Sequence, residues 1–131
     1  MPKFSKQSLE RLATCHLDIQ LVMNDVIKVF DCSIIYGHRG EEEQNRLFEA
    51  GRSQLKWPKS PHNKTPSMAV DVIPYPLKDW KDLTGFRLLQ EKVILISEFH
   101  GIQLFHGAWF PKLQDWPHWE IIPKRKRAKL S

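Results

Sequence analysis

The sequence predicts a single α+β domain in which a small antiparallel or mixed sheet is flanked by helices. Helical and strand-like segments interleave along the chain, but without the regular strand–helix–strand rhythm of a parallel sheet. The chain has 131 residues, of which 41% are hydrophobic and 27% charged, as in an ordinary globular protein with one core. We expect residues 1–123 to form the domain and residues 124–131 to form a basic tail.

The first part of the chain predicts a helix, a strand and a second helix. Apolar residues recur at three- and four-residue steps over 8–30, as on a core-facing helix, and His16 is the point where this helix could break. The residues of this stripe are Leu9, Leu12, Leu17, Leu21, Val22, Val26 and Val29. Residues 32–36 are β-rich and predict a strand. Glutamates at 41–43 favour the start of a helix that ends near Gly51, because negative charge in the first turn complements the helix dipole.

The second part predicts a loop followed by strands around one long helix. Residues 52–68 are polar and proline-rich, which is typical of a loop. The apolar run 69–73 predicts a buried strand that Pro74 stops. Gly101 is well placed to end a helix. The remaining elements are a helix from 84 or 86 to 100 and short strands at 102–105 and 118–122.

The positive charge of the chain is concentrated at its C-terminal end. The formal charge is +5, from 20 basic and 15 acidic residues. Five basic residues lie in the predicted tail: Lys124, Arg125, Lys126, Arg127 and Lys129. Without them the body is neutral. The tail is therefore either a solvated terminus or an electrostatic contact for a polyanion such as a wall polymer, lipid headgroups or nucleic acid.

The cysteines and the N-terminal segment indicate the cellular compartment in which the chain is made. The N-terminus has no apolar segment of the kind found in signal peptides, and no run is long enough to span a membrane. We therefore expect synthesis in a reducing cytoplasm without a signal peptide. Cys15 and Cys32 are expected to be buried and inert.

Three potential metal ligands stand in two separate motifs. His62 and Asp71 lie in S-P-H-N-K-T-P-S-M-A-V-D, and His118 lies in D-W-P-H-W-E. Two imidazoles and one carboxylate suit zinc, and three protein ligands leave a tetrahedral ion one open position, as in catalytic sites. Asp71 lies within an apolar run, where a carboxylate is costly unless it is paired or bound to a metal.

Carboxylates near His118 are candidates for a general base. Asp115 lies three residues before His118 and is the preferred candidate. Glu120 is the rival, because residues two apart on a strand point to the same face. His38 and Trp109 are candidates for substrate binding, with loop-end exposure and core packing as the alternatives. His106 has the same two interpretations as His38.

The two motifs resemble the signature of the D-Ala-D-Ala carboxypeptidase and L-alanyl-D-glutamate endopeptidase family. These are zinc peptidases that cut peptidoglycan peptides, and many are tailed-phage endolysins. The resemblance extends to F-S-K-Q-S-L-E-R-L and Y-G-H-R-G-E-E-E-Q and covers the chain to about Ile122. It implies a hedgehog/D-Ala-D-Ala peptidase-like fold with the zinc site on the sheet.

The resemblance also implies roles for individual residues. His62, Asp71 and His118 match the zinc ligands and Asp115 matches the general base. Arg39 matches an arginine expected near the substrate, where it would hold a carboxylate or the oxyanion. The alternative for Arg39 is a salt bridge to one of the glutamates at 41–43. Ser60 matches the serine that opens the first motif, in a supportive or substrate-binding role.

Two departures from the common family pattern stand out. His62 and Asp71 are nine residues apart (71 − 62), where the common spacing is seven. Ala108 occupies a position before Trp109 that often carries an acid. A function that needs that acid is therefore in doubt for this chain.

Three functions remain open at this level. The leading one is a zinc-dependent endopeptidase of phage origin that cleaves the L-Ala–D-Glu bond of peptidoglycan, as a monomer, after release to the cell wall. The second is a D-Ala-D-Ala carboxypeptidase or dipeptidase. The third is a non-enzymatic nucleic-acid-binding protein that uses residues 124–129, although one terminal basic cluster favours no stable nucleic-acid partner.

Overall fold

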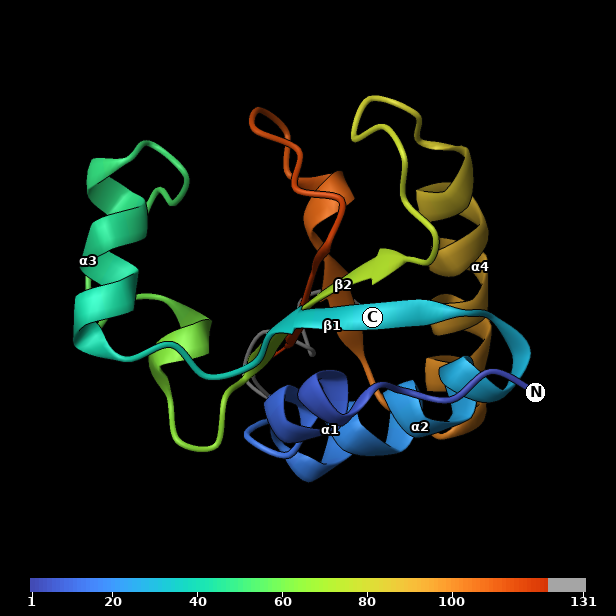
Figure 1. Ribbon diagram of the computed structural model, residues 1–131. Helices are drawn as coiled ribbons and strands as arrows, with labels where there is room; N and C mark the ends of the chain where they lie inside the picture. The colour runs from blue at the N-terminus through green and yellow to red at the C-terminus, as the bar shows by residue number, and fades with distance from the viewer. Residues whose placement is uncertain (123–131) are drawn as a thin grey trace.

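The computed structural model describes residues 1–122, so the predicted tail and the domain boundary at 123 lie outside the described residues (Figure 1). The chain forms helices, strands and two short 3₁₀ turns (η) in this order: α1 (Lys6–Leu12), α2 (Leu17–Val29), β1 (Cys32–Tyr36), α3 (Glu41–Glu49), η1 (Pro61–Asn63), β2 (Ala69–Pro74), α4 (Thr84–Phe99), β3 (Leu104–His106), η2 (Gly107–Trp109) and β4 (His118–Ile121).

The strands form one antiparallel sheet with the order β1-β2-β4-β3. The predicted α+β class is confirmed, and of the two predicted sheet types the antiparallel one is present. Strands β2 and β4, which are far apart in the sequence, are neighbours at the centre of the sheet. Their register pairs Asp71 with His118. Because directly opposed residues share a face, both side chains point to the same side of the sheet.

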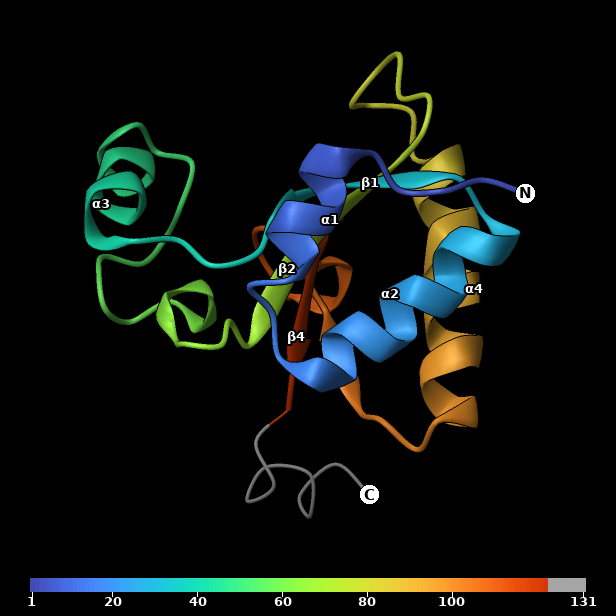
Figure 2. The ribbon, with the colours of Figure 1, turned by 60° about the horizontal axis from the view of Figure 1, so that its bottom comes forward.

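One face of the sheet is covered by helices and the other carries the polar groups. Helices α2 and α4 pack together against the first face (Figures 1 and 2), where Ile34, Val70, Val72 and Trp119 belong to the hydrophobic core. The intervening residues of the central strands point to the other face, because side chains alternate along a strand. Helix α3 lies to the side of the sheet, beyond the end of β1 (Figure 1).

The helix predicted over 8–30 is broken, and this corrects part of its predicted core face. Helix α1 ends at Leu12 and α2 begins at Leu17, with His16 as the N-cap that accepts a hydrogen bond from the Asp18 N–H. The break resets the helical phase, so Leu17 is 75% exposed. Leu9, Leu21 and Val29 are exposed as well. The other three residues of the predicted stripe, Leu12, Val22 and Val26, are buried as predicted, and α2 also buries Ile19, Met23 and Ile27.

The strand predicted over 102–105 begins later than predicted. The Ile102 N–H donates to the carbonyl of Ser97, so residue 102 still belongs to the turn that closes α4. Gly101 has a φ of +69°, the left-handed conformation that glycine adopts readily after a helix. The other helices and strands lie within two residues of their predicted bounds.

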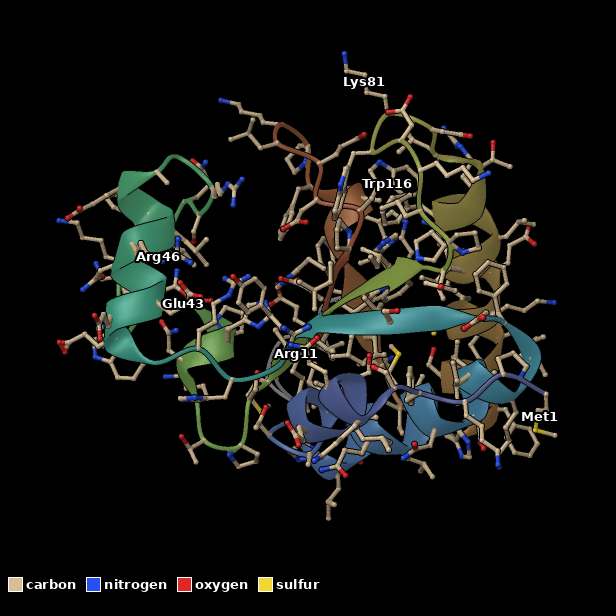
Figure 3. All side chains as sticks on the ribbon, in the orientation of Figure 1. Met1, Arg11, Glu43, Arg46, Lys81 and Trp116 are labelled. Atoms are coloured by element: carbon tan, nitrogen blue, oxygen red, sulfur yellow. The ribbon has the colours of Figure 1, made fainter. Side chains whose placement is uncertain are left out.

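The outer edge of β1 is covered by α1. Arg11 donates to the carbonyl of Ile34 at 3.0 Å, and the Ile34 N–H donates to Ser8 Oγ at 3.0 Å. Figure 3 shows Arg11 between α1 and β1. These side chains occupy backbone groups that would otherwise be open to pairing with another strand.

The two thiols are free and buried, as predicted. Burial raises the pKa of both Cys15 and Cys32 to about 12, so neither forms a thiolate near neutral pH. Within residues 1–122, no helix has the length and apolar character needed to cross a membrane.

Candidate active site

The three predicted metal ligands meet on the open face of the sheet. His62 comes from η1, Asp71 from β2 and His118 from β4, and all three are buried. His62 Nε2, His118 Nδ1 and Asp71 Oδ1 form a triangle whose three sides are each 3.3 Å. This group could hold a metal ion.

The local sequence around His62 fixes the direction of its ring. Ser60 caps η1, because its hydroxyl accepts from the His62 N–H while the Asn63 side chain accepts from the Ser60 N–H. The ring nitrogen Nδ1 donates to the carbonyl of Gly37 at 2.8 Å. Nε2 is therefore the nitrogen that faces Asp71 and His118. Ser60 is itself buried, and its hydroxyl contacts the backbone of His62.

Gly37 is held tightly in this arrangement. A Cβ atom at this position would collide with the carbonyl oxygen of Arg11 and with Thr14 Oγ1. The close approach to α1 needs a residue without a side chain. It fixes the carbonyl that orients the His62 ring.

His118 is held by carboxylates at both ring nitrogens. Nε2 donates to Glu120 Oε1 at 2.8 Å, and Nδ1 lies 3.3 Å from Asp71 Oδ1. Burial alone would lower the pKa of His118, but the neighbouring carboxylates of Asp71 and Glu120 outweigh it and raise the pKa to about 10. A cation at this site would take the place of the Nδ1 proton. Metal-binding histidines usually donate their second N–H in the way that His118 donates to Glu120.

Asp71 connects the three-residue group to Arg39. Arg39 Nη2 donates to Asp71 Oδ2 at 2.6 Å, while Asp71 Oδ1 is buried without a hydrogen-bond partner among the described residues. Burial would raise the pKa of Asp71, but His62 and His118 outweigh that cost and hold the pKa far below its usual value. An unpaired buried carboxylate oxygen is costly, and coordination to a cation would satisfy it. The residues therefore fit a metal ion.

The salt bridge suggested for Arg39 has a different partner from the one expected. Arg39 pairs with Asp71, whereas Glu43 pairs with Arg46 and accepts from the Tyr36 hydroxyl. The Arg39 guanidinium lies over the Tyr36 ring, with Cζ 4.3 Å from its centroid. Arg39 therefore belongs to the site, where it contacts the Asp71 oxygen that faces away from the two histidines.

Asp115 stands beside the metal-ligand group at the surface. The backbone of the turn holds it, since its N–H donates to the carbonyl of Gly107 at 2.9 Å and its carbonyl accepts from the His118 N–H at 3.2 Å. Partial desolvation and the charge of Asp71 raise the pKa of Asp115. A carboxyl group whose pKa is shifted toward neutrality suits general-base catalysis.

The ring contacts of Trp109 and the hydrogen bond of the His38 N–H are made to residues other than the three metal-ligand candidates. Trp109 is 46% exposed and its ring packs edge-on against Phe105 and His106. His38 lines a separate cavity of about 340 Å³ between α1, the end of β1 and α3. The structure leaves both residues at the margins of the site.

Two contributions to the site were not predicted from the sequence. Phe110 stacks on His118 with ring centroids 6.0 Å apart, and the Gly37 carbonyl orients His62. Glu120, the rival candidate for the base, lies on the same face of the sheet as His118, as predicted, and its carboxylate accepts from the His118 ring. The sequence indicates this position of Glu120, because it lies two residues after His118 on a predicted strand. Nothing in the sequence indicates Phe110 or the backbone carbonyl.

The chain was compared with known protein families and structures. A family model described as phage L-alanyl-D-glutamate peptidase matches residues 1–121. The chain belongs to this peptidase family. It is therefore a hydrolase, a peptidoglycan endopeptidase.

A solved structure has the same fold. The peptidase is similar to the Serratia marcescens L-Ala D-Glu endopeptidase ChiX, with a TM-score of 0.78 and 23% sequence identity over 98% of this chain and 95% of that chain. At this identity the likeness supports the fold. A comparison with curated proteins found no match.

Glu120 of the peptidase offers a test of how His118 is held. Replacing Glu120 with Ala is expected to lower metal affinity or activity by about 10–100-fold, because the imidazole loses the partner that sets its orientation. Metal titration and turnover measurements check this. Glu120→Gln keeps an acceptor oxygen and should lose less. Unchanged metal affinity with abolished turnover would instead make Glu120 the base.

His106 of the peptidase is buried as well, so the interpretation of it as a partly exposed residue at a loop end is wrong. It is 1% exposed and stacks on Trp119 with ring centroids 3.9 Å apart. Nε2 lies 2.8 Å from the carbonyl of Trp116, and Nδ1 lies 2.9 Å from Gln90 Nε2. Burial lowers the pKa of His106 to about 4, so the ring is neutral in the folded peptidase.

The neutral state of His106 predicts a pH dependence of stability. Between about pH 4 and 6.5 the unfolded chain binds a proton that the folded state does not, so the stability rises with pH in this window. The contribution is at most roughly 3 kcal/mol and is fully present above pH 6.5. The contribution of His106 is the difference in the pH dependence of the free energy of unfolding between the wild type and His106→Gln, measured with denaturant across this window. Parallel pH curves for the two proteins would contradict the prediction.

Proposed function

We propose that the chain is a zinc-dependent endopeptidase that cleaves the L-Ala–D-Glu bond of the peptidoglycan stem peptide. The observation that carries the proposal is the triangle of three buried ligand atoms on the open face of the sheet. Membership of the phage L-alanyl-D-glutamate peptidase family supports the choice of bond.

The size of the triangle supports zinc. A tetrahedral zinc ion with bonds of about 2.0–2.1 Å to nitrogen and oxygen separates neighbouring ligand atoms by about 3.3–3.4 Å. The three separations of 3.3 Å between His62 Nε2, His118 Nδ1 and Asp71 Oδ1 match this value. Two imidazoles and a carboxylate are also a ligand set found in catalytic zinc sites. When bound, zinc polarises a carbonyl oxygen and makes water acidic.

Asp115 is proposed to move the proton of the reaction. Its carboxylate takes a proton from the attacking water and gives it to the departing amine as the peptide bond breaks. The raised pKa of Asp115 favours the return of the proton, and attachment of its backbone to Gly107 limits its movement. The reaction consumes one water and leaves a new carboxylate and a new amine.

Arg39 and Glu120 are proposed to act on the ligands. Arg39 holds Asp71 Oδ2, so that Oδ1 faces the two imidazoles, and Glu120 holds the second nitrogen of His118. The positive charge of the guanidinium would also favour the oxyanion that forms from the scissile carbonyl or a carboxylate of the substrate. Trp109, with its exposed ring, and His38 remain candidates for contact with more distant parts of the substrate.

The test is digestion of purified peptidoglycan and of a synthetic stem peptide, followed by mass analysis. The proposal expects products with a new N-terminal D-Glu, loss of activity with chelator, and recovery with zinc. Release of D-alanine would instead assign a D-Ala-D-Ala carboxypeptidase. Full activity of the metal-free protein would exclude the metal site as the centre of the reaction.

A further inference from the structure

The turn that carries Asp115 is attached to the core face of the sheet by His106. His106 is the last residue of β3 and is paired with Trp119 of β4, so its ring points to the core face rather than to the metal-ligand face. There it stacks on the Trp119 ring and reaches the carbonyl of Trp116. Trp116 follows Asp115 directly. Figure 3 labels Trp116 beside the start of α4. Its ring lies near Phe86 and Arg87 of that helix.

The hydrogen bonds of His106 leave one tautomer. A backbone carbonyl only accepts, so Nε2 must carry the proton that it shares with Trp116. Nδ1 then has a lone pair and accepts from the side-chain amide of Gln90 on α4. The ring is therefore fixed by stacking on one face and by a hydrogen bond at each nitrogen. It is a rigid donor aimed at a single carbonyl.

The next residue holds the same turn at a second place. The carbonyl of Gly107 accepts from the Asp115 N–H at 2.9 Å. A Cβ atom at Gly107 would collide with the carbonyl oxygen of Asp115 and would lie 3.0 Å from the Asp115 Cβ atom. Gly107 thus approaches Asp115 more closely than a residue with a side chain could, and His106 contacts Trp116 beside it.

We propose that His106 is a positioning residue for Asp115: its Nε2–H, held by Gln90, fixes the Trp116 carbonyl and thereby the orientation of the proposed general base beside the metal ligands. The inference rests on the proposed function, because it assumes that Asp115 carries the proton. His118 is attached to this turn through its N–H, but its pairing with Asp71 across β2 and β4 also sets its position. Loss of the His106 hydrogen bond should therefore disturb the base and spare the metal ligands.

Two isosteric substitutions of His106 separate the hydrogen bond from the packing. The amide of Gln can donate from about the place of Nε2, whereas the amide of Asn reaches only the place of Nδ1. His106→Asn is expected to lower kcat on a synthetic stem peptide by about 10–100-fold, since a displacement of about 1 Å of a reacting group costs this much. KM and zinc affinity should change less than about twofold. His106→Gln should restore kcat to within about threefold of the wild type.

The outcome that overturns the inference is equal kcat for the Gln and Asn variants, whether both are high or both are low. The tautomer gives a test that needs no variant. Nitrogen NMR of the wild-type protein should show His106 protonated at Nε2 and not at Nδ1, and protonation at Nδ1 would overturn the inference.

Asp115→Asn in the same assay distinguishes this inference from the function on which it rests. An active Asp115→Asn variant removes the proposed base and the proposed function with it. An inactive Asp115→Asn variant together with a fully active His106→Asn variant removes only the positioning role.

Discussion

Replacing Asp115 with Asn is expected to lower kcat by about 10²–10⁴-fold, the usual contribution of a general base. The amide keeps the size of the side chain and the backbone hydrogen bonds to Gly107 and His118, but it cannot take a proton. Metal content should be unchanged, because Asp115 is not among the three ligand candidates. Steady-state kinetics on a synthetic stem peptide, with metal analysis of the same sample, measure both quantities.

The pH profile provides a further check on Asp115. In the wild type kcat/KM should fall as the pH drops through the raised pKa of Asp115, since protonation removes the base. That acidic limb should be absent from the residual activity of Asp115→Asn. Glu91→Gln, which changes an exposed carboxylate on α4, is the matched control and should behave as the wild type. Near-normal turnover by Asp115→Asn would exclude Asp115 as the base.

Replacing His62 with Ala is expected to abolish turnover and metal binding together. The variant loses one of three ligands, and the metal contributes several kcal/mol of transition-state stabilisation, so we expect a loss of about 10³-fold or more. Chelation of the wild type should have the same effect. Turnover, metal analysis and thermal unfolding with and without added zinc measure the result.

The thermal measurement separates loss of the metal from loss of the fold. Zinc at about 100 times its Kd should stabilise the wild type by about 2.7 kcal/mol and raise its Tm by roughly 10 °C. His62→Ala should show almost no such shift. His100→Ala is the control, because His100 lies beyond α4 and its ring pairs with Asp25 on α2. A full zinc-dependent shift in His62→Ala would show that His62 is not a ligand.

The three metal-ligand candidates could be predicted because their weak individual signals combine into one ligand set. Asp71 lies in an apolar run, where a carboxylate needs a partner, and the two histidines stand in short motifs. The structure brings all three together. The resemblance to a peptidase family, made on these same motifs, is confirmed by the family match over residues 1–121.

The helical phase around His16 shows where local patterning was not enough. A stripe running through 8–30 assigns Leu17 to the core, but the chain breaks before it and Leu17 is exposed. Hydrophobic periodicity identifies a helix without fixing where the phase restarts. That depends on backbone hydrogen bonds such as the one from the His16 N–H to the Ser67 carbonyl, which joins segments far apart in the chain.

The sequence by itself determined the α+β class, most element bounds and the identity of the three ligand candidates, because periodicity and side-chain chemistry are local properties. Only the tertiary structure decided which atoms of those residues face one another and what holds them. Arg39 on Asp71 and the Gly37 carbonyl on His62 are contacts between segments that lie far apart in the chain. Their geometry arises from strand register and close packing of distant segments, which spacing along one chain does not encode.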